Sequence, residues 1–524
     1  MLKPKNLRRI LMTLAAGTAA ALALTACGSS VPKDSDAGKS EQVADGTLTM
    51  GLSTEPQHLY AGKDAGNVGY MMYSLLHRGL VAYDNEGNLI EGLAESYEEV
   101  DPTTYEFKLR SGLTFSDGTD LTSTDVAKTL EHLANPDSAA HVYAGLKDIA
   151  SVDTPDEQTV IVHLQNPNNA FLQYLAAPTA GIVPQAALAD DVDAWVGAGP
   201  FVLDKHESGS EMVLKRNDSY YEADKVRLET LNLVFYPDGA ARTNALLSGD
   251  VDIVDYVPWE DFDRVESSDG ITLDAQDGPF MYLHFNVTDG PMSDPKVRQA
   301  VAYAVNRENA VAAGFSGHGS PLYGMPIQGD DPNFDAAWET MWEYDPEKAK
   351  ELLAEAGYDD GLTLSLLTSA QYAFHQDTGL SIQADLEAIG IKVELKNPDW
   401  PTRVEEGNAG NYDIAVSGNV GIVTDLSYIQ SFVDGPANYT RSFGYSNADL
   451  NAALTEGVQA TDAAAQKAAY DRAREIIVDD VPLTTVNSRA QGFAFNEKVG
   501  GFKNLPGFLT FYAGYGLIDM YEIG

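Results

Sequence analysis

The sequence predicts an α/β protein, because strand and helix patterns alternate from residue 47 to the C-terminus. Apolar and polar residues alternate over 105–110, as expected for a half-buried strand. Residues 346–356 instead place Ala349, Leu352 and Leu353 on one helical face. The chain beyond residue 46, about 480 residues, is too long for one ordinary core and suits two or three domains.

The elements follow one another with clear boundary signals. Residues 159–164 (TVIVHL) are a β-branched run that favours a strand. Before it, residues 126–134 have apolar residues at helical spacing, and Asn135-Pro136 ends that helix. Two further helices open on Asp294-Pro295 and Asp345-Pro346, each of which offers a capping side chain and a first-turn proline.

A strand–helix–strand unit follows. We expect a strand at 362–367, a helix at about 375–389 and a second strand at 391–395. A connection of this length favours parallel pairing of the two strands. Residues 412–417 are predicted to form a further strand.

The N-terminus has the features of a secretory signal peptide over residues 1–26. Four basic residues within residues 3–9 precede a short apolar run at 10–24, which is below the ~20 residues that span a bilayer. The run ends in Leu24-Thr-Ala-Cys27, which resembles a bacterial lipoprotein signal, and Cys27 is the only cysteine. The resemblance implies lipidation of Cys27 after cleavage. Residues 27–46 are small and polar, which indicates a flexible tether.

The charge balance is strongly acidic. The chain has 34 Lys and Arg against 78 Asp and Glu. Residues 1–26 carry four of the basic residues and no acidic ones, so the processed chain has a net charge of −48. Such a surface repels nucleic acid and anionic lipid headgroups, and we interpret the acidity as a solvated exterior.

An enzyme is the alternative class to weigh. The sequence has no Gly-x-Ser-x-Gly elbow, no His-Glu-x-x-His zinc motif and no Walker A pattern (Gly-x-x-x-x-Gly-Lys-Ser/Thr) for phosphate binding. A carboxylate pair for glycoside cleavage stays open, but no spacing selects one. We therefore expect no catalytic residue, no metal and no cofactor, and keep a secreted hydrolase as the alternative.

Several blocks resemble family 5 of the extracellular solute-binding proteins, the peptide- and nickel-binding components of ABC importers. The blocks occur in this order: 105–119 (YEFKLRSGLTFSDGT), 121–126 (LTSTDV), 199–203 (GPFVL), 249–253 (GDVDI), 285–287 (FNV) with 294–306 (DPKVRQAVAYAVN), and 344–358 (YDPEKAKELLAEAGY). The resemblance runs from about residue 47 to the C-terminus.

The resemblance implies a two-lobed fold of the type II periplasmic binding proteins, with a third small subdomain inserted in lobe I. Lobe I would comprise residues 47–284 and 488–524, with the inserted subdomain at about 70–195. Lobe II would comprise residues 285–487. Strands near 281–285 and 484–488 would carry the crossings, and a ligand would lie between the lobes and be enclosed by hinge closure.

The resemblance also implies candidate ligand residues. Asp425 lies where peptide-binding relatives carry an aspartate that pairs with the ligand's α-amino group. The family usually has two acids there after a Gly-Trp pair, whereas this chain has one, with Asn419 in place of the Trp and Tyr428 following. A helix-capping role is the alternative for Asp425.

Other candidates follow predicted strands, where cleft residues are common. Trp400 could cover ligand side chains and Arg403 could meet a carboxylate, against core and surface alternatives. Two further groups complete the set: Tyr372, Phe374 and His375 before a helix, and Glu55, Gln57, His58 and Tyr60 after the first strand.

We interpret the chain as the monomeric, lipid-anchored receptor of an ABC importer, with oligopeptides as the expected ligands. Its partners would be two permease subunits and cytoplasmic ATPases, with no nucleic acid and no membrane contact beyond the lipid. A nickel chelate, an oligosaccharide or another non-peptide solute is the alternative ligand. A signalling receptor that binds ligand without transport is a third possibility.

The anchor gives a first prediction. Cys27→Ser removes the only thiol that can be lipidated, so the protein should move from the membrane pellet to the soluble fraction on cell fractionation. A variant that stays in the pellet would refute the lipid anchor.

Overall fold

The computed structural model describes residues 42–524 except 57, 327–335, 420 and 422–424. Its largest feature is an eleven-stranded mixed sheet with the order β15-β14-β16-β12-β17-β11-β1-β10-β9-β8, in which β13 also pairs with β17. The strands are β1 (Gly46–Leu52), β8 (Phe201–Glu207), β9 (Glu211–Arg216), β10 (Leu228–Phe235), β11 (Ile253–Val254), β12 (Ile271–Phe285), β13 (Gly319–Pro321), β14 (Leu362–Leu367), β15 (Ile391–Lys396), β16 (Ile414–Asn419) and β17 (Leu483–Asn496).

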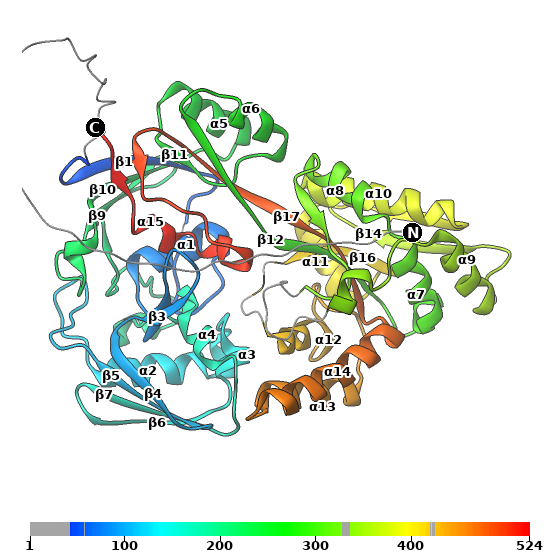
Figure 1. Cartoon of the computed structure of the whole chain (residues 1–524), viewed down its shortest axis with the longest axis horizontal. Helices are drawn as coiled ribbons and strands as arrows, with labels where there is room; N and C mark the ends of the chain where they lie inside the picture. Colours follow the sequence, from blue (N-terminus) through cyan, green and yellow to red (C-terminus); the bar gives the residue numbers. More distant parts are fainter. Residues whose placement is uncertain (1–41, 57, 327–335, 420, 422–424) are drawn as a thin grey trace, which may run out of the picture. The chain divides into compact units, whose positions relative to one another are not determined.

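Helices cover the sheet and link its strands (Figure 1). They are α1 (Gly66–Leu76), α2 (Ser123–Leu133), α3 (Tyr143–Leu146), α4 (Phe171–Ala176), α5 (Gly239–Ser248), α6 (Phe262–Glu266), α7 (Pro295–Ala304), α8 (Arg307–Phe315), α9 (Pro346–Glu355), α10 (Ala373–Ala388), α11 (Trp400–Ala409), α12 (Gln430–Val433), α13 (Ala448–Gln459), α14 (Ala463–Asp480) and α15 (Gly514–Leu517). In the described part of the chain, no helix has the length and apolar character needed to cross a bilayer.

The long antiparallel pair of β12 and β17 lies in the middle of the sheet (Figure 1). Their register runs from Ile271 opposite Asn496 to His284 opposite Leu483. At one end β17 pairs with β11, and at the other end β12 pairs with β16. These two strands therefore join the two ends of the sheet, and both are longer than the crossings expected near 281–285 and 484–488.

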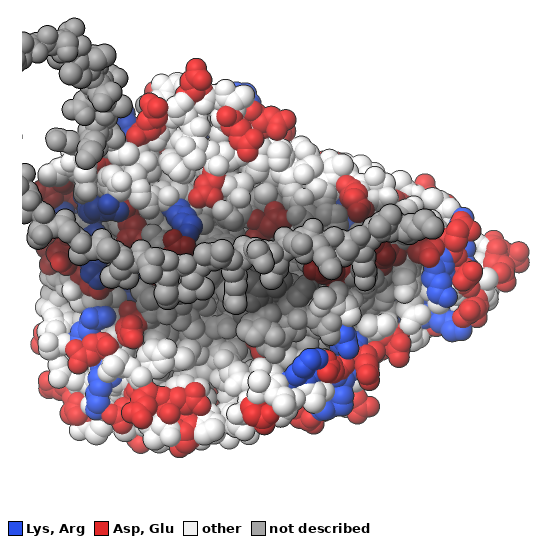
Figure 2. Space-filling model, viewed as in Figure 1, with Lys and Arg blue, Asp and Glu red and all other residues white. Residues whose placement is uncertain are grey.

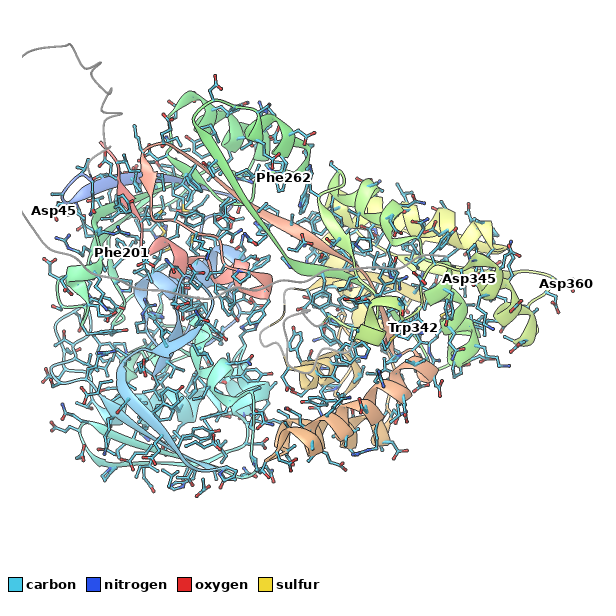
Figure 3. All side chains as sticks on the ribbon, viewed as in Figure 1. Asp45, Phe201, Phe262, Trp342, Asp345 and Asp360 are labelled. Carbon is cyan, nitrogen blue, oxygen red and sulfur yellow. The ribbon has the colours of Figure 1, made fainter. Side chains whose placement is uncertain are left out.

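Two large hydrophobic cores lie along this sheet. The first core is built by residues from 48 to 253 and from 493 to 520, and the second by residues from 245 to 494. Phe201 of the first core and Phe262 and Trp342 of the second are labelled in Figure 3. Phe493 packs into the first core and Ala494 into the second, because successive side chains of β17 point to opposite faces. Most buried apolar residues of 245–265, a segment that the expected division assigned to lobe I, pack into the second core, whereas Ile253 packs into the first.

A separate antiparallel sheet occupies residues 94–164. Its order is β4-β5-β7-β6, with β4 (Ala94–Asp101), β5 (Thr104–Leu109), β6 (Ile149–Asp156) and β7 (Thr159–Leu164). Helix α2 packs against β6 and β7. The short pairs β2 (Val81–Tyr83) with β3 (Leu89–Glu91), and β18 (Val499–Gly500) with β19 (Tyr521–Glu522), complete the strands.

Aspartate and asparagine side chains cap many of the helices. Asp294 accepts from the backbone N–H of Lys296 at 2.9 Å, and Asp345 accepts from that of Lys348 at 2.9 Å. Each cap satisfies a backbone donor that the helix leaves unpaired and places negative charge at the positive end of the helix dipole. Some of the acidic residues of the chain therefore serve as helix N-caps.

The predicted strand–helix–strand unit is confirmed. β14 and β15 have the expected positions and pair in parallel, with α10 between them. The strand expected at 412–417 begins two residues later, as β16. The reason lies before it, because Gly410 ends α11 at a φ of 71° and Tyr412 bonds back to Gly410, so the chain is still turning there.

Acidic side chains are spread over the face seen in Figure 2, and the middle of this face is hollowed.

A buried carboxyl of α10 gives a prediction on pH. Asp385 is 8% exposed and accepts from the backbone N–H of Asn306 at 2.8 Å. Burial raises the pKa of Asp385 to about 6. Between this value and the ordinary pKa of an unfolded aspartate, the native state binds more protons, so the free energy of unfolding should fall as pH rises from about 4 to about 6.

Asp385→Asn keeps an acceptor for Asn306 and removes the titration. Its melting temperature should exceed that of the wild type at pH 7 and match it at pH 4, with a difference in stability of at most about 3 kcal/mol. Thermal unfolding at both pH values checks this, and an equal offset at the two would contradict it.

Candidate functional site

An aromatic cluster forms where α10 and α11 begin, and it unites four of the predicted residues. Ring centroids are 5.3 Å apart for Tyr372 and Trp400, 5.5 Å for His375 and Trp400, and 4.8 Å for Phe374 and His375. The cause is the parallel pairing of β14 and β15, in which Leu367 lies opposite Lys396. Parallel strands release their chains at the same edge of a sheet, so the segments after β14 and β15 meet there.

Arg403 of α11 lies beside this cluster and is fully buried. Its guanidinium carbon is 5.3 Å from the Trp400 ring centroid, and burial lowers its pKa. Nη1 donates to the carbonyl of Tyr439 at 2.9 Å, and Nη2 donates to the carbonyl of Val416 at 2.7 Å and to Ser417 Oγ. Both terminal nitrogens thus bind oxygens of the chain itself, whereas Nε is buried and has no partner among the residues that the structure describes. Bidentate binding of a carboxylate, one of the two roles considered for Arg403, would need these bonds to break.

A second arginine, which the sequence reasoning missed, comes from β17. Arg489 is 6% exposed, and its Nη1 donates to the hydroxyl of Tyr256 at 2.7 Å. Its guanidinium carbon lies 4.9 Å from the Phe374 ring and 5.8 Å from the Trp259 ring. Arg489 therefore touches the predicted cluster through Phe374.

Two more polar side chains of β17 share the face of Arg489. Asn487 and Gln491 lie two residues to either side of it, so all three point the same way. Both are buried, and within the described part of the chain Asn487 Oδ1 and both polar side-chain atoms of Gln491 have no hydrogen-bond partner. Each such atom costs about 1–3 kcal/mol when left unpaired, so an outside partner is expected here. The alternation Asn-x-Arg-x-Gln within a buried strand is the sequence signal that could have revealed this site.

His375 is held neutral in this environment. Burial, followed by the positive charges of Arg403 and Arg489, lowers its pKa to about 3. Its Nδ1 is buried and has no hydrogen-bond partner in the described ranges. Near neutral pH the imidazole thus offers one donor and one acceptor and adds no charge.

Asn419 and Tyr428 lie at the boundary of the two cores. The Tyr428 hydroxyl donates to Asn419 Oδ1 at 2.7 Å, and the Tyr428 ring packs against both cores. Near this boundary, Asn169 joins the part of the chain before α4 to the end of α13. Its backbone N–H donates to the carbonyl of Val458 at 2.9 Å, and its Nδ2 donates to that of Ala460 at 3.0 Å.

Asp425 has the capping role that was the alternative to ligand binding. It is the N-cap of a short 3₁₀ segment, Leu426–Ile429, and accepts from the backbone N–H of Ser427 at 2.8 Å. The hydroxyl of Tyr470 donates to the same oxygen. Asp425 is 6% exposed, so this carboxylate is packed among groups of its own chain.

The candidates after β1 have partners in the first half of the chain. Glu55 accepts from His206 at 2.8 Å and from the backbone N–H of Gly209 at 3.0 Å. His58 Nδ1 is 3.1 Å from the Asp193 carboxylate, and the Tyr60 ring stacks on His58 at 5.4 Å. These contacts hold the three side chains against the first half of the chain. Gln57 lies outside the described residues.

The site offers polar recognition and aromatic surface. Within the described ranges, no group of three or more His, Cys, Asp or Glu side chains is placed to hold a metal ion. The chemically distinctive groups are the two guanidinium groups, the neutral imidazole and the unpaired amides, which can bind a solute through hydrogen bonds.

The role of Asp425 can be tested directly. Asp425→Ala removes the cap and the partner of Tyr470, so the free energy of unfolding should fall by about 1–3 kcal/mol. Asp425→Asn keeps an acceptor oxygen and should lose less. Urea unfolding measures both. An Asp425→Asn variant of wild-type stability with tenfold weaker solute binding would instead place Asp425 in the ligand site.

Comparisons with known proteins agree on one family. Residues 88–440 match the model of the bacterial extracellular solute-binding proteins, family 5. The chain is 29% identical over 450 residues to the glutathione-binding protein GsiB of Pectobacterium atrosepticum. The alignment covers 82% of this chain and 86% of the relative.

Solved structures show the same fold. The periplasmic binding protein AgaA of A. tumefaciens R10, in complex with agropinic acid, is 39% identical with a TM-score of 0.82, covering 91% of this chain and 99% of that one. DppA of Helicobacter pylori, in complex with the peptide STSA, is 20% identical with a TM-score of 0.79, covering 92% and 99%. The fold is the type II periplasmic-binding-protein fold expected from the sequence, and the chain belongs to the bacterial extracellular solute-binding proteins of family 5, the extracytoplasmic components that deliver solutes to ABC permeases.

Proposed function

We propose that this protein captures one small organic solute where β17 meets the start of α10, and presents it to the permease. The unpaired polar atoms of β17 are the observation that carries the proposal. Asn487, Arg489 and Gln491 project from one strand face, each with a buried polar atom that lacks a partner among the described residues. A buried group of this kind is normally paired, so a solute is the natural partner.

The sheet geometry supports capture by closure. β12 and β17 join the two ends of the sheet, and Arg489 lies near the middle of β17. Of its aromatic neighbours, Trp259 and Phe374 pack with the second core, whereas Tyr256 packs against both cores. A solute bound there would touch groups from both sides, so binding would favour the closed arrangement and the permease could recognise it.

Relatives carry names or ligands as different as glutathione, agropinic acid and the peptide STSA. A short peptide remains within this range for our chain. Because Asp425 is engaged by Ser427 and Tyr470, an α-amino group anchored on Asp425 is not the basis of the proposal.

We extend the proposal to the setting of the protein. Lipid on Cys27 would hold it at the outer face of the cell membrane, with the segment at 28–46 as a tether. It would act as a monomer and release its solute unchanged, because its role ends with delivery.

The experiment begins with protein purified gently from its own host. Native mass spectrometry should show one bound solute per chain, and denaturation should release it for identification. Deletion of the gene should then abolish uptake of the isotope-labelled solute, and the wild-type gene should restore it. Protein that carries no solute, together with unchanged uptake across a panel of solutes in the deletion strain, would overturn the proposal.

A further inference from the structure

The plane of the Arg489 guanidinium is fixed, and one edge of it has no partner. The rings of Phe374 and Trp259 lie 4.9 and 5.8 Å from its central carbon, and Tyr256 takes Nη1. Nε is buried and unpaired, and no described residue accepts a hydrogen bond from Nη2. Nε and Nη2 form the side-on edge of the guanidinium, whose two parallel N–H groups match the two oxygens of a carboxylate.

The charge of Arg489 is also uncompensated. None of the described carboxylates lies within ion-pair distance of Arg489 or Arg403, although the chain has 78 acidic residues. Other buried arginines have such a partner, as Arg298 has in Asp480 at 2.8 Å and Arg242 has in Asp255 at 3.5 Å. A buried cation is costly unless it is paired, so Arg489 needs an anion that the described chain does not supply.

Arg307 shows that not every buried arginine in this fold calls for an anion. Its donors bind carbonyl oxygens of Leu322, Thr485 and Trp342, at 2.9–3.1 Å. Arg307 is thus satisfied by the backbone. Arg489 differs because its one hydrogen bond to the described residues goes to a hydroxyl, and no described residue occupies its side-on edge.

We propose that the captured solute carries a carboxylate and that Arg489 binds it side-on through Nε and Nη2. This inference rests on the proposed capture of a solute at β17. The neighbouring amides of Asn487 and Gln491 bind the remaining polar groups of the solute, and the rings of Phe374 and Trp259 restrict the carboxylate to the guanidinium plane. Recognition starts from the acid group of the solute, whereas the family resemblance implied an amino group paired with Asp425 as one of the two roles of that residue.

The test uses three acids as probes: agropinic acid, glutathione and the dipeptide Met-Leu, each with a carboxamide analogue. Isothermal titration of the full mature protein should show binding of at least one acid and at least tenfold weaker binding of its amide. Arg489→Gln should weaken the binding of that acid by about 100-fold or more, because truncation leaves the carboxylate buried and unpaired. Arg489→Lys keeps the positive charge but lacks the two parallel N–H groups, so its affinity for the acid should lie between those of the wild type and Arg489→Gln.

Unfolding of the solute-free proteins separates binding from structure. Arg489→Gln removes a buried unpaired charge, so its melting temperature should equal or exceed that of the wild type. Arg472→Gln, at a half-exposed arginine of α14, is the matched control and should change neither affinity nor melting temperature.

The outcomes distinguish the two proposals. Arg489→Gln with wild-type affinity, or an amide that binds as tightly as its acid, would overturn the carboxylate inference while solute capture stands. So would a carboxylate-free solute released from host-purified protein, or a failure of all three acids to bind. Protein that carries no solute, with unchanged uptake after gene deletion, would overturn capture itself.

Discussion

The antiparallel pairing of β12 with β17 is the constraint on which the rest of the structure depends. These strands join the two ends of the sheet, and the alternate faces of β17 supply both hydrophobic cores. The register breaks between Asp277 and Phe280. Gly278 lies in this break, where a Cβ would come within 1.8 Å of the Gly507 carbonyl oxygen, so only glycine lets the C-terminal segment pack here.

The same pair of strands accepts a cost in stability. In the centre of the sheet, where apolar side chains would pack better, buried polar atoms of Asn487, Arg489 and Gln491 have no partner in the described part of the chain. Local rules of folding are broken mainly where a protein has to bind something, because the missing partner is then the ligand. The proposed site thus gathers several buried polar atoms that lack a partner among the described residues.

Negative and positive charges occupy different parts of the molecule. Many acidic side chains cap helices or lie at the surface, whereas the proposed site gathers Arg403, Arg489 and a histidine that these cations help to keep neutral. The acidic exterior would slow the approach of a small anion. The positively charged interior site would stabilise the anion once it is bound and buried. Selectivity would then reside in the closed state.

The sequence by itself determined the class of the fold and most of its local structure. The Asp-Pro helix starts and the β14–α10–β15 unit follow from periodicity and capping, which act over a few residues. Tyr372 and Trp400 could be chosen because segments after parallel strands meet at one edge. Only the tertiary structure decided the use of Asp425 and Arg489. A capping and a ligand-binding carboxylate have the same local sequence, and Arg489 becomes a site only when β17 brings it against Tyr256, Trp259 and Phe374, which lie more than 100 residues away along the chain.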